Sequence, residues 1–200
     1  MAMAPDDRAG STHDRMGRFQ QASLYLTAMH PARCEIEELE AQCKFRFSRA
    51  SGPGGQHRNK VETHVTVEHL PTGILATAGE ARSQGENRQR AMHRLRRALA
   101  VGVRGENADL SACPSNLWLR YCRGQRIRVA DTNPDYPAIL AEALDMLAAC
   151  DWDPAQAGKA LGVSATQIVG LAAQYPPALE LLNQQLMARG RARRSPPRDS

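Results

Sequence analysis

The residues with the most unusual chemistry lie between Ser51 and Lys60, in the stretch Ser-Gly-Pro-Gly-Gly-Gln-His-Arg-Asn-Lys. Three glycines and one proline within five positions exclude a regular helix or strand, so we expect a loop. Glycines at 54 and 55 let the backbone take positive φ and approach another molecule closely. A plain surface turn is the alternative for such a stretch in isolation. We interpret it as a loop that is inserted into a partner, with Gln56 at its tip and basic residues behind.

Alternating sequence patterns on both sides of the loop predict the strands that hold it. Phe45 and Phe47 alternate with polar residues over 43–48, and valines alternate with polar residues over 61–69. A Pro-Thr-Gly turn at 71–73 leads to a third strand over 74–78. The loop therefore connects the first two strands of a small sheet.

A helix is predicted directly after the sheet. Ser83, with Glu86 three residues on, is typical of a capping box, and the helix should run to about Leu99. Its apolar stripe, Ala91, Leu95, Ala98 and Leu99, should cover the sheet and leave the arginines facing outward. Three strands and one covering helix predict an α+β fold.

Residues 134–188 are rich in alanine and leucine and predict a small all-α domain after the α+β unit. Pro154 to Ala173 resembles a helix-turn-helix, with Gly162 at the turn and Gly158 where the helices cross. Its second helix, Ser164 to Gln174, contains no Lys or Arg, and residues 131–187 hold seven acids and one lysine. Since phosphate neutralisation supplies most of the affinity for DNA, we expect no DNA binding and favour packing or protein docking.

These patterns divide the chain into six segments. They are a disordered leader (1–17), an N-terminal helical segment (18–42), the α+β domain that contains the glycine loop (43–101), a connector (102–133), the helical domain (134–188) and a basic disordered tail (189–200). The connector adds four arginines to the surface: Arg120, Arg123, Arg126 and Arg128. A short helix is expected over 35–42.

Composition excludes several classes of protein. Lys and Arg number 26 against 21 Asp and Glu, a formal net charge of +5, and the arginines concentrate between Arg82 and Arg97. The five cysteines are an odd number without a Cys-x-x-Cys pair, so we predict neither disulfides nor a metal centre. No apolar run is long enough for a signal peptide or a membrane span, so we expect a cytoplasmic protein without membrane contact.

Three motifs together carry a family resemblance. Residues 45–63, then His69-Leu70-Pro71-Thr72-Gly73-Ile74, then Arg82-Ser83-Gln84 with Asn87, resemble the catalytic domain of class I peptide chain release factors. The resemblance covers about residues 43–100 and is nearest to the short release-factor-like proteins of bacteria. Release factors that read stop codons carry a decoding domain and a helical arm ahead of the catalytic domain. Only 53 residues precede Gly54 here, so we expect no stop-codon reader.

The resemblance implies hydrolysis of the ester that joins a peptide to tRNA, active only on the ribosome and without a cofactor. It assigns catalysis to Gly54, Gly55 and Gln56, with the Gln56 backbone N–H stabilising the oxyanion. It further assigns RNA binding to a set of polar residues: His57, Arg58, Asn59, Lys60, Arg82, Gln84, Asn87 and Arg88. The implied partners are ribosomal RNA and peptidyl-tRNA, and residues 134–188 are free to dock a protein partner.

Other functions stay open at this point. His57 and Glu62 are titratable groups near the loop that raise general-base catalysis as an alternative, but we assign His57 to RNA contact or loop positioning. The missing decoding domain favours codon-independent rescue of stalled ribosomes over ordinary termination. The alternatives are a non-catalytic ribosome- or RNA-binding protein and a helix-turn-helix regulator.

Overall fold

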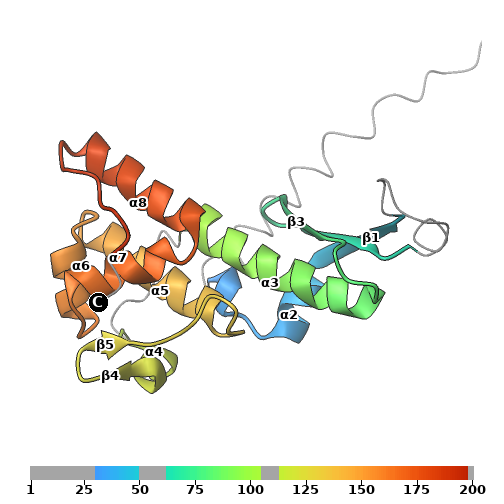
Figure 1. The fold of residues 1–200 in the computed structure, drawn as a ribbon, viewed down its shortest axis with the longest axis horizontal. Helices are drawn as coiled ribbons and strands as arrows, with labels where there is room; N and C mark the ends of the chain where they lie inside the picture. Colours follow the sequence, from blue (N-terminus) through green and yellow to red (C-terminus); the bar gives the residue numbers. More distant parts are fainter. Residues whose placement is uncertain (1–29, 50–61, 105–112, 198–200) are drawn as a thin grey trace, which may run out of the picture.

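The computed structural model describes residues 30–49, 62–104 and 113–197. The strands form one three-stranded sheet and one short hairpin, and the helices gather mostly beyond one end of the sheet (Figure 1). The elements in chain order are η1 (Pro31–Arg33), α2 (Ile36–Ala41), β1 (Cys43–Ser48), β2 (His64–His69), β3 (Ile74–Ala78), α3 (Gln84–Gly102), α4 (Asn116–Tyr121), β4 (Cys122–Arg123), β5 (Arg126–Ile127), α5 (Tyr136–Ala149), α6 (Pro154–Ala160), α7 (Ala165–Ala173) and α8 (Pro176–Ala188).

The sheet is antiparallel in the order β1-β2-β3. Ser48 of β1 faces His64 of β2, the last pair before the residues of the glycine loop. Val65 and Val67 of β2 are fully buried, while Thr66 and Glu68 are only half-buried, because alternate side chains point to opposite faces of a strand. The buried face packs against α3, and the predicted α+β fold is confirmed.

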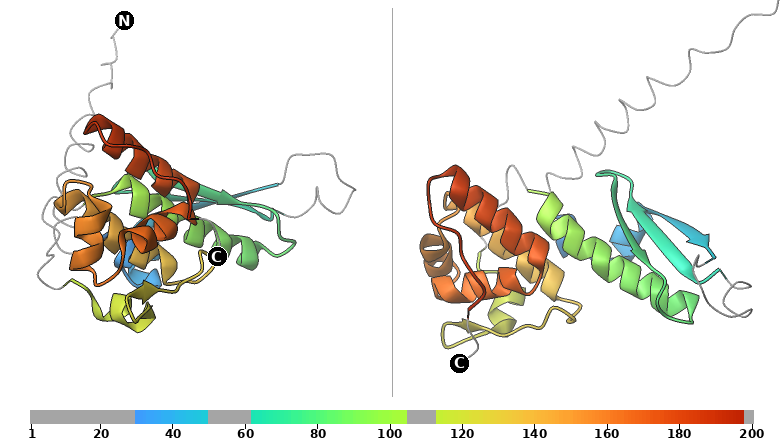
Figure 2. Two further views of the ribbon diagram at one scale, coloured as in Figure 1. Left: turned by 60° about the vertical axis from the view of Figure 1, so that its left-hand side comes forward. Right: turned by 45° about the horizontal axis from the view of Figure 1, so that its top comes forward.

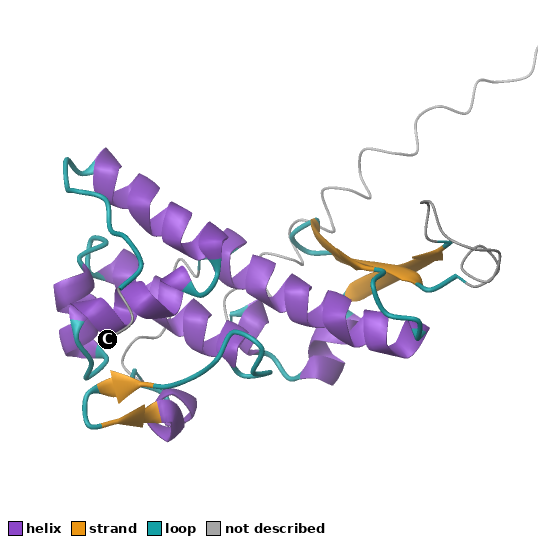
Figure 3. Cartoon of the chain, viewed as in Figure 1, coloured by secondary structure: helices purple, strands orange, loops and turns teal. Residues whose placement is uncertain are grey.

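Helix α3 serves both the sheet and the helical layer (Figures 1 and 3). Its N-cap is Ser83, whose hydroxyl accepts the Glu86 N–H as predicted. It covers β2 and β3 and also packs against α5. The predicted boundary at residue 101 falls inside its last turn, and the buried side chains of the sheet and the helices form one cluster.

One arginine of α3 does not follow the prediction that these side chains face outward. Arg96 is buried, and its Nη atoms donate to the carbonyl oxygens of Pro134 at 2.8 Å and Ala32 at 3.0 Å. The prediction was wrong here because Arg96, although it is not part of the apolar stripe, is covered by backbone segments that are distant in the sequence. Arg96 thereby ties the N-terminal segment and the entry to α5 to the same turn of α3.

Helices α5 to α8 form the helical layer. Helix α5 is buried along its length from Tyr136 to Leu147, which makes it the centre of this layer. Between α6 and α7 the chain turns at Gly162, where φ is +71°, and a Cβ on Gly158 would lie 2.7 Å from the Val163 carbonyl oxygen. Both glycines therefore have the roles in this helix pair that the sequence predicted.

The connector packs onto the helical layer. Trp118 of α4 is buried, and its Nε1 donates to the Leu161 carbonyl at 2.9 Å. The strands β4 and β5 form a hairpin, and Ile127 of β5 is buried while its N–H donates to Gln167 of α7. Leu119, on the other face of α4, is exposed.

The described part of the C-terminal tail is not the free, disordered segment that the sequence predicted. The backbone N–H and carbonyl of Arg194 both bond to the Asn183 amide of α8, at 2.7 and 3.0 Å. Arg189 and Arg191 pair with Asp151. Composition alone gave a wrong prediction for 189–197 because these contacts join residues far apart in sequence. Within the described ranges no helix is long and apolar enough to cross a membrane.

Candidate functional site around the glycine loop

The glycine loop itself, residues 50–61, lies outside the described residues. The predicted catalytic residues Gly54, Gly55 and Gln56 fall there, as do His57, Arg58, Asn59 and Lys60, so their assignment stays a prediction. The described structure instead shows the two stems that carry the loop. Both stems leave the same end of the sheet, on the right in Figure 1 and in both views of Figure 2.

The two stems are joined by a strand pair. Ser48 and His64 are partners in the register, and Ser48 Oγ lies 3.3 Å from His64 Nδ1. The His64 ring packs against Gly79, where an added Cβ would come within 2.5 Å of His64 Cδ2. The strand pair therefore fixes where the connection begins and ends, although the fifteen residues 49–63 lie between Ser48 and His64.

Two amide side chains at the start of α3 hold the outgoing stem. Gln84 Nε2 donates to the Glu62 carbonyl at 2.9 Å. Asn87 Nδ2 donates to the Thr63 carbonyl at 2.6 Å and to the Ala81 carbonyl at 2.9 Å, and its Oδ1 accepts the Ala81 N–H. Asn87 is fully buried. Its assignment to RNA binding therefore needs correction, because both of its N–H groups are used inside the protein.

Arg88 and Arg82, the two arginines of this region that were predicted to bind RNA, have different surroundings. Arg88 donates to both carboxylate oxygens of Glu40 on α2, at 2.7 and 3.4 Å, and its guanidinium lies 4.2 Å from the centre of the Phe45 ring. It therefore braces α3 against α2 and β1. Arg82 is exposed and makes no ion pair within the described part of the chain, so its charge remains available to a phosphate.

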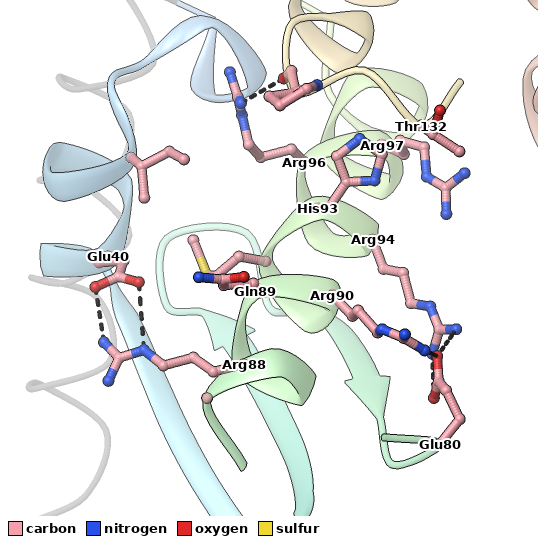
Figure 4. A pocket seen from close by; sticks show the side chains of 14 residues that line it. Glu40, Glu80, Arg88, Gln89, Arg90, His93, Arg94, Arg96, Arg97 and Thr132 are labelled. Atoms are coloured by element: carbon pink, nitrogen blue, oxygen red, sulfur yellow. Dashed lines mark hydrogen bonds and ion pairs between the residues drawn. The ribbon is translucent and has the colours of Figure 1, made fainter. Parts of the chain in front are cut away.

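A groove of about 840 Å³ runs along the outer side of α3, between α2 and residues 132–134 (Figure 4). It is lined by five arginines and two glutamates, so its charge is positive. Figure 4 shows Arg88 turned to Glu40, and Arg90 and Arg94 turned to Glu80. Because the carboxylates already engage these guanidinium groups, the groove has less free charge than its composition indicates.

Glu80, which organises one wall of this groove, is not marked by any motif or pattern in the sequence. Hydrogen bonding from the Gly79 N–H, with Arg94 beside it, lowers the pKa of Glu80 to about 2. The carboxylate is therefore ionised throughout the physiological range and holds Arg94, which also donates to the Thr77 carbonyl at 2.7 Å. The pairing joins residues 14 positions apart, so no local spacing rule finds it; the Glu86–Arg90 pair, four apart on α3, follows the ordinary helix rule.

No group of three or more His, Cys, Asp or Glu in the described ranges is arranged to hold a metal ion. Burial raises the pKa of the Cys43 thiol to about 11, with Glu40 acting in the same direction. Burial likewise raises the pKa of Cys113 to about 11. Both cysteines are therefore protonated thiols at neutral pH and poor nucleophiles.

The comparison with protein families decides what the sheet and α3 are. Residues 32–116 match the family model described as the RF-1 domain. The chain therefore contains a domain similar to the RF-1 domain of class I release factors. This release-factor domain begins before the predicted residue 43 and takes in η1 and α2, in agreement with the full burial of Ala32 and Leu39.

Three relatives match between 37% and 53% of this chain. Peptide chain release factor 1 of Nitrosomonas europaea is 46% identical over 110 residues, which are 53% of this chain and 31% of that protein. Peptide chain release factor 1 of Acidiphilium cryptum is 38% identical over 102 residues, 48% of this chain and 29% of that protein. The mitochondrial translation release factor in rescue of Danio rerio is 46% identical over 74 residues, 37% of this chain and 45% of that protein. The chain thus spans about three tenths of the release factor 1 proteins and under half of the rescue factor.

Proposed function

We propose that this protein hydrolyses the ester between a nascent peptide and tRNA on the ribosome, and that it does so without reading a stop codon. The observation that carries the proposal is the release-factor domain over 32–116, which contains Gly54-Gly55-Gln56 on the connection between β1 and β2. Independence from the codon is supported by the similarity to a rescue factor. The substrate is the peptidyl-tRNA ester, and the water that attacks it is the second reactant.

The reaction needs stabilisation of charge more than it needs a base. Attack of water on the ester carbonyl creates an oxyanion, which donors already aimed at it stabilise most strongly. In the proposed mechanism the Gln56 backbone N–H is that donor, since Gly54 and Gly55 allow a backbone conformation that a side chain would make costly. Water gives one proton to the departing ribose oxygen, and its hydroxyl remains on the peptide as a carboxyl group.

Positioning of the loop falls to α3. Gln84 and Asn87 fasten Glu62 and Thr63, so the outgoing stem is held by hydrogen bonds to a long, well-packed helix. A misplaced donor loses much of its effect on the transition state. In this proposal the two amides act as positioning residues, and the direct RNA contacts come from Arg82 and the basic residues of the loop.

The test is release of labelled peptide from purified ribosomes that hold peptidyl-tRNA. The decoding site is left empty, filled with a sense codon or filled with a stop codon. We expect release with the empty site, and a loss on the order of a hundredfold in Gly55→Ala, as for the removal of an oxyanion donor.

Gly85→Ala is the matched control. Gly85 lies in the first turn of α3 of the same domain, and an added Cβ would meet nothing closer than Ser83 Oγ at 3.7 Å. We expect this variant to release peptide at the wild-type rate. Release only at stop codons would contradict codon independence. Ribosome binding without peptide release in any state would mean that the protein is a binding protein and not an enzyme.

A further inference from the structure

The hairpin β4–β5 carries a dense group of cations outside the release-factor domain. Arg123, Arg126 and Arg128 are all exposed, and Arg120 on the preceding helix is 69% exposed. Arg120 approaches Asp135 only at 4.0 Å, and within the described ranges the other three make neither an ion pair nor a side-chain hydrogen bond. Several other arginines pair with carboxylates instead: Arg46, Arg88, Arg90, Arg94, Arg189, Arg191 and Arg193.

The backbone of the hairpin places like charges side by side. Arg123 and Arg126 are direct partners in the antiparallel register, where like charges are unfavourable. The turn between them has φ of +55° at Gly124 and +62° at Gln125, as a two-residue hairpin turn requires. The turn therefore holds the two arginines side by side, and a bound anion would relieve the repulsion between them.

The hairpin is also firmly held. Ile127 is buried, its N–H donates to Gln167 Oε1 on α7 at 3.2 Å, and the Arg128 N–H donates to the Tyr121 carbonyl at 3.0 Å. The neighbouring helix α4 is anchored by Trp118. The arginines therefore stand on a rigid support, and binding loses less conformational freedom than it would with a free basic tail.

We propose that this arginine hairpin, residues 120–128, is a second RNA-binding site that grips the phosphodiester backbone. Guanidinium groups bind phosphate oxygens in pairs. The ribbon from Arg123 to Arg126 has no apolar side chain, whereas protein-docking surfaces usually have an apolar centre. Phosphate contacts carry no sequence information, so the site reads shape and charge rather than bases.

The location of the hairpin gives it a separate role from the loop. In Figures 1 and 2 the hairpin lies at the opposite end of the molecule from the end of the sheet where β1 stops and β2 starts. The protein would thus contact RNA at two distant points, and the helical layer would serve as the support for the second one. The choice of RNA over other polyanions rests on the proposed function.

The experiment is binding of the full chain to a fluorescein-labelled RNA duplex of about 20 base pairs, and to purified ribosomes, over a series of KCl concentrations. The hairpin variant combines Arg123→Gln, Arg126→Gln and Arg128→Gln. We expect its affinity for both probes to fall on the order of a hundredfold near 0.1 M KCl, and the slope of log affinity against log salt to fall by about three.

A tail variant is the matched control. Arg189→Gln, Arg191→Gln and Arg193→Gln remove the same formal charge from the same half of the chain, but each of these arginines pairs with Asp151 or Glu180. We expect a loss of about threefold or less in the tail variant. Thermal unfolding checks that the hairpin variant folds, and its midpoint should not fall, because the opposed pair of arginines is gone.

Several results would overturn the proposal. The first is an equal loss of affinity in the two variants, which would mean that net charge alone decides the affinity. The second is that the wild type does not bind the RNA duplex, and the third is that it binds a DNA duplex of the same sequence more tightly. A hairpin variant that binds the RNA duplex normally but fails on ribosomes would point to an acidic protein partner instead. Because these are binding measurements, they remain readable even if the peptide-release assay fails.

Discussion

At the scale of single residues, Asn87 shows how a residue of the family motif can act without touching the substrate. Its amide bonds to Thr63 and Ala81, which lie on opposite sides of β2 and β3 in sequence, and it does so from the first turn of α3. The resemblance to release factors implied RNA contact for this residue. In the structure the Asn87 side chain is buried, and its hydrogen bonds hold the outgoing stem of the loop in place.

We predict that Asn87→Ala lowers the free energy of unfolding by about 2–3 kcal/mol, because it leaves partly buried backbone groups at Thr63 and Ala81 without partners. Denaturant unfolding monitored by circular dichroism measures this. Gln84→Ala, which removes one hydrogen bond from an exposed side chain, should cost under about 1 kcal/mol. If the Asn87→Ala variant had wild-type stability and weakened RNA binding, the assignment of Asn87 to RNA binding would be correct after all.

His30 makes stability dependent on pH. Burial lowers the pKa of His30 to about 4, against 6.5 in an exposed chain. The neutral Nε2–H form donates to the Val103 carbonyl at 3.1 Å while Nδ1 accepts the Ala32 N–H, so a proton on Nδ1 would face another donor. The unfolded chain therefore binds more protons than the folded chain between pH 6.5 and 4, and stability is lost as pH falls through this window.

We predict a loss on the order of 2 kcal/mol in the free energy of unfolding from His30 alone between pH 7 and 4.5. Burial also lowers the pKa of His69, to about 4, and of His93, so both add to the same trend. In His30→Gln, whose amide can donate and accept at the same place, the pH dependence should be shallower. A parallel curve for the variant and the wild type would exclude His30 as a source.

At the scale of elements, local signals sufficed for α3, α6 and α7 because each of these helices begins with a capping residue that can be recognised in the sequence. Ser83, Asp153 and Ser164 each accept backbone N–H groups of the helix that follows. The strands β1 and β2 were also predicted from local sequence, because the alternation of apolar and polar residues repeats every two positions. The helix-turn-helix pair α6–α7 was found in this way, and its glycines have the geometry that the spacing indicated.

The same geometry argues against a recognition role for α7. Gln167 is bonded to the hairpin, and a Cβ on Gly170, one turn further, would lie 3.3 Å from Pro197 of the tail. Hairpin and tail thus both lie against α7. The helix pair is a support for other segments, in agreement with the absence of Lys and Arg from residues 164–174.

We predict that Gly158→Ala lowers the free energy of unfolding by about 1–3 kcal/mol, because its Cβ would press on the Val163 carbonyl, which is backbone and cannot swing away. Intrinsic helix propensity alone predicts the opposite sign, a gain of up to about 1 kcal/mol. Thermal unfolding distinguishes the two. Gly85→Ala, on a helix with free space, is the control and should be neutral or slightly stabilising.

At the scale of the whole molecule, the sequence predicted the α+β unit and the helices but not how they are joined. Arg96 meets Ala32 and Pro134 across 64 and 38 residues, and the tail meets α8 through Asn183, so no window of sequence contains these contacts. For the site, spacing and family motif predicted the loop between β1 and β2. The structural roles of Arg88 and Asn87 depend on partners far away, and the residues of the loop tip lie outside the described ranges.

The position of α3 also limits how such proteins can be recombined. Leu95 and Leu99 are both fully buried on a helix that packs against the sheet and against α5. A crossover that replaced everything after residue 101 would keep these side chains but discard the surface that covers part of them. A graft at this boundary would therefore need a donor sequence that brings its own matching α5, because the sheet, α3 and α5 share one core.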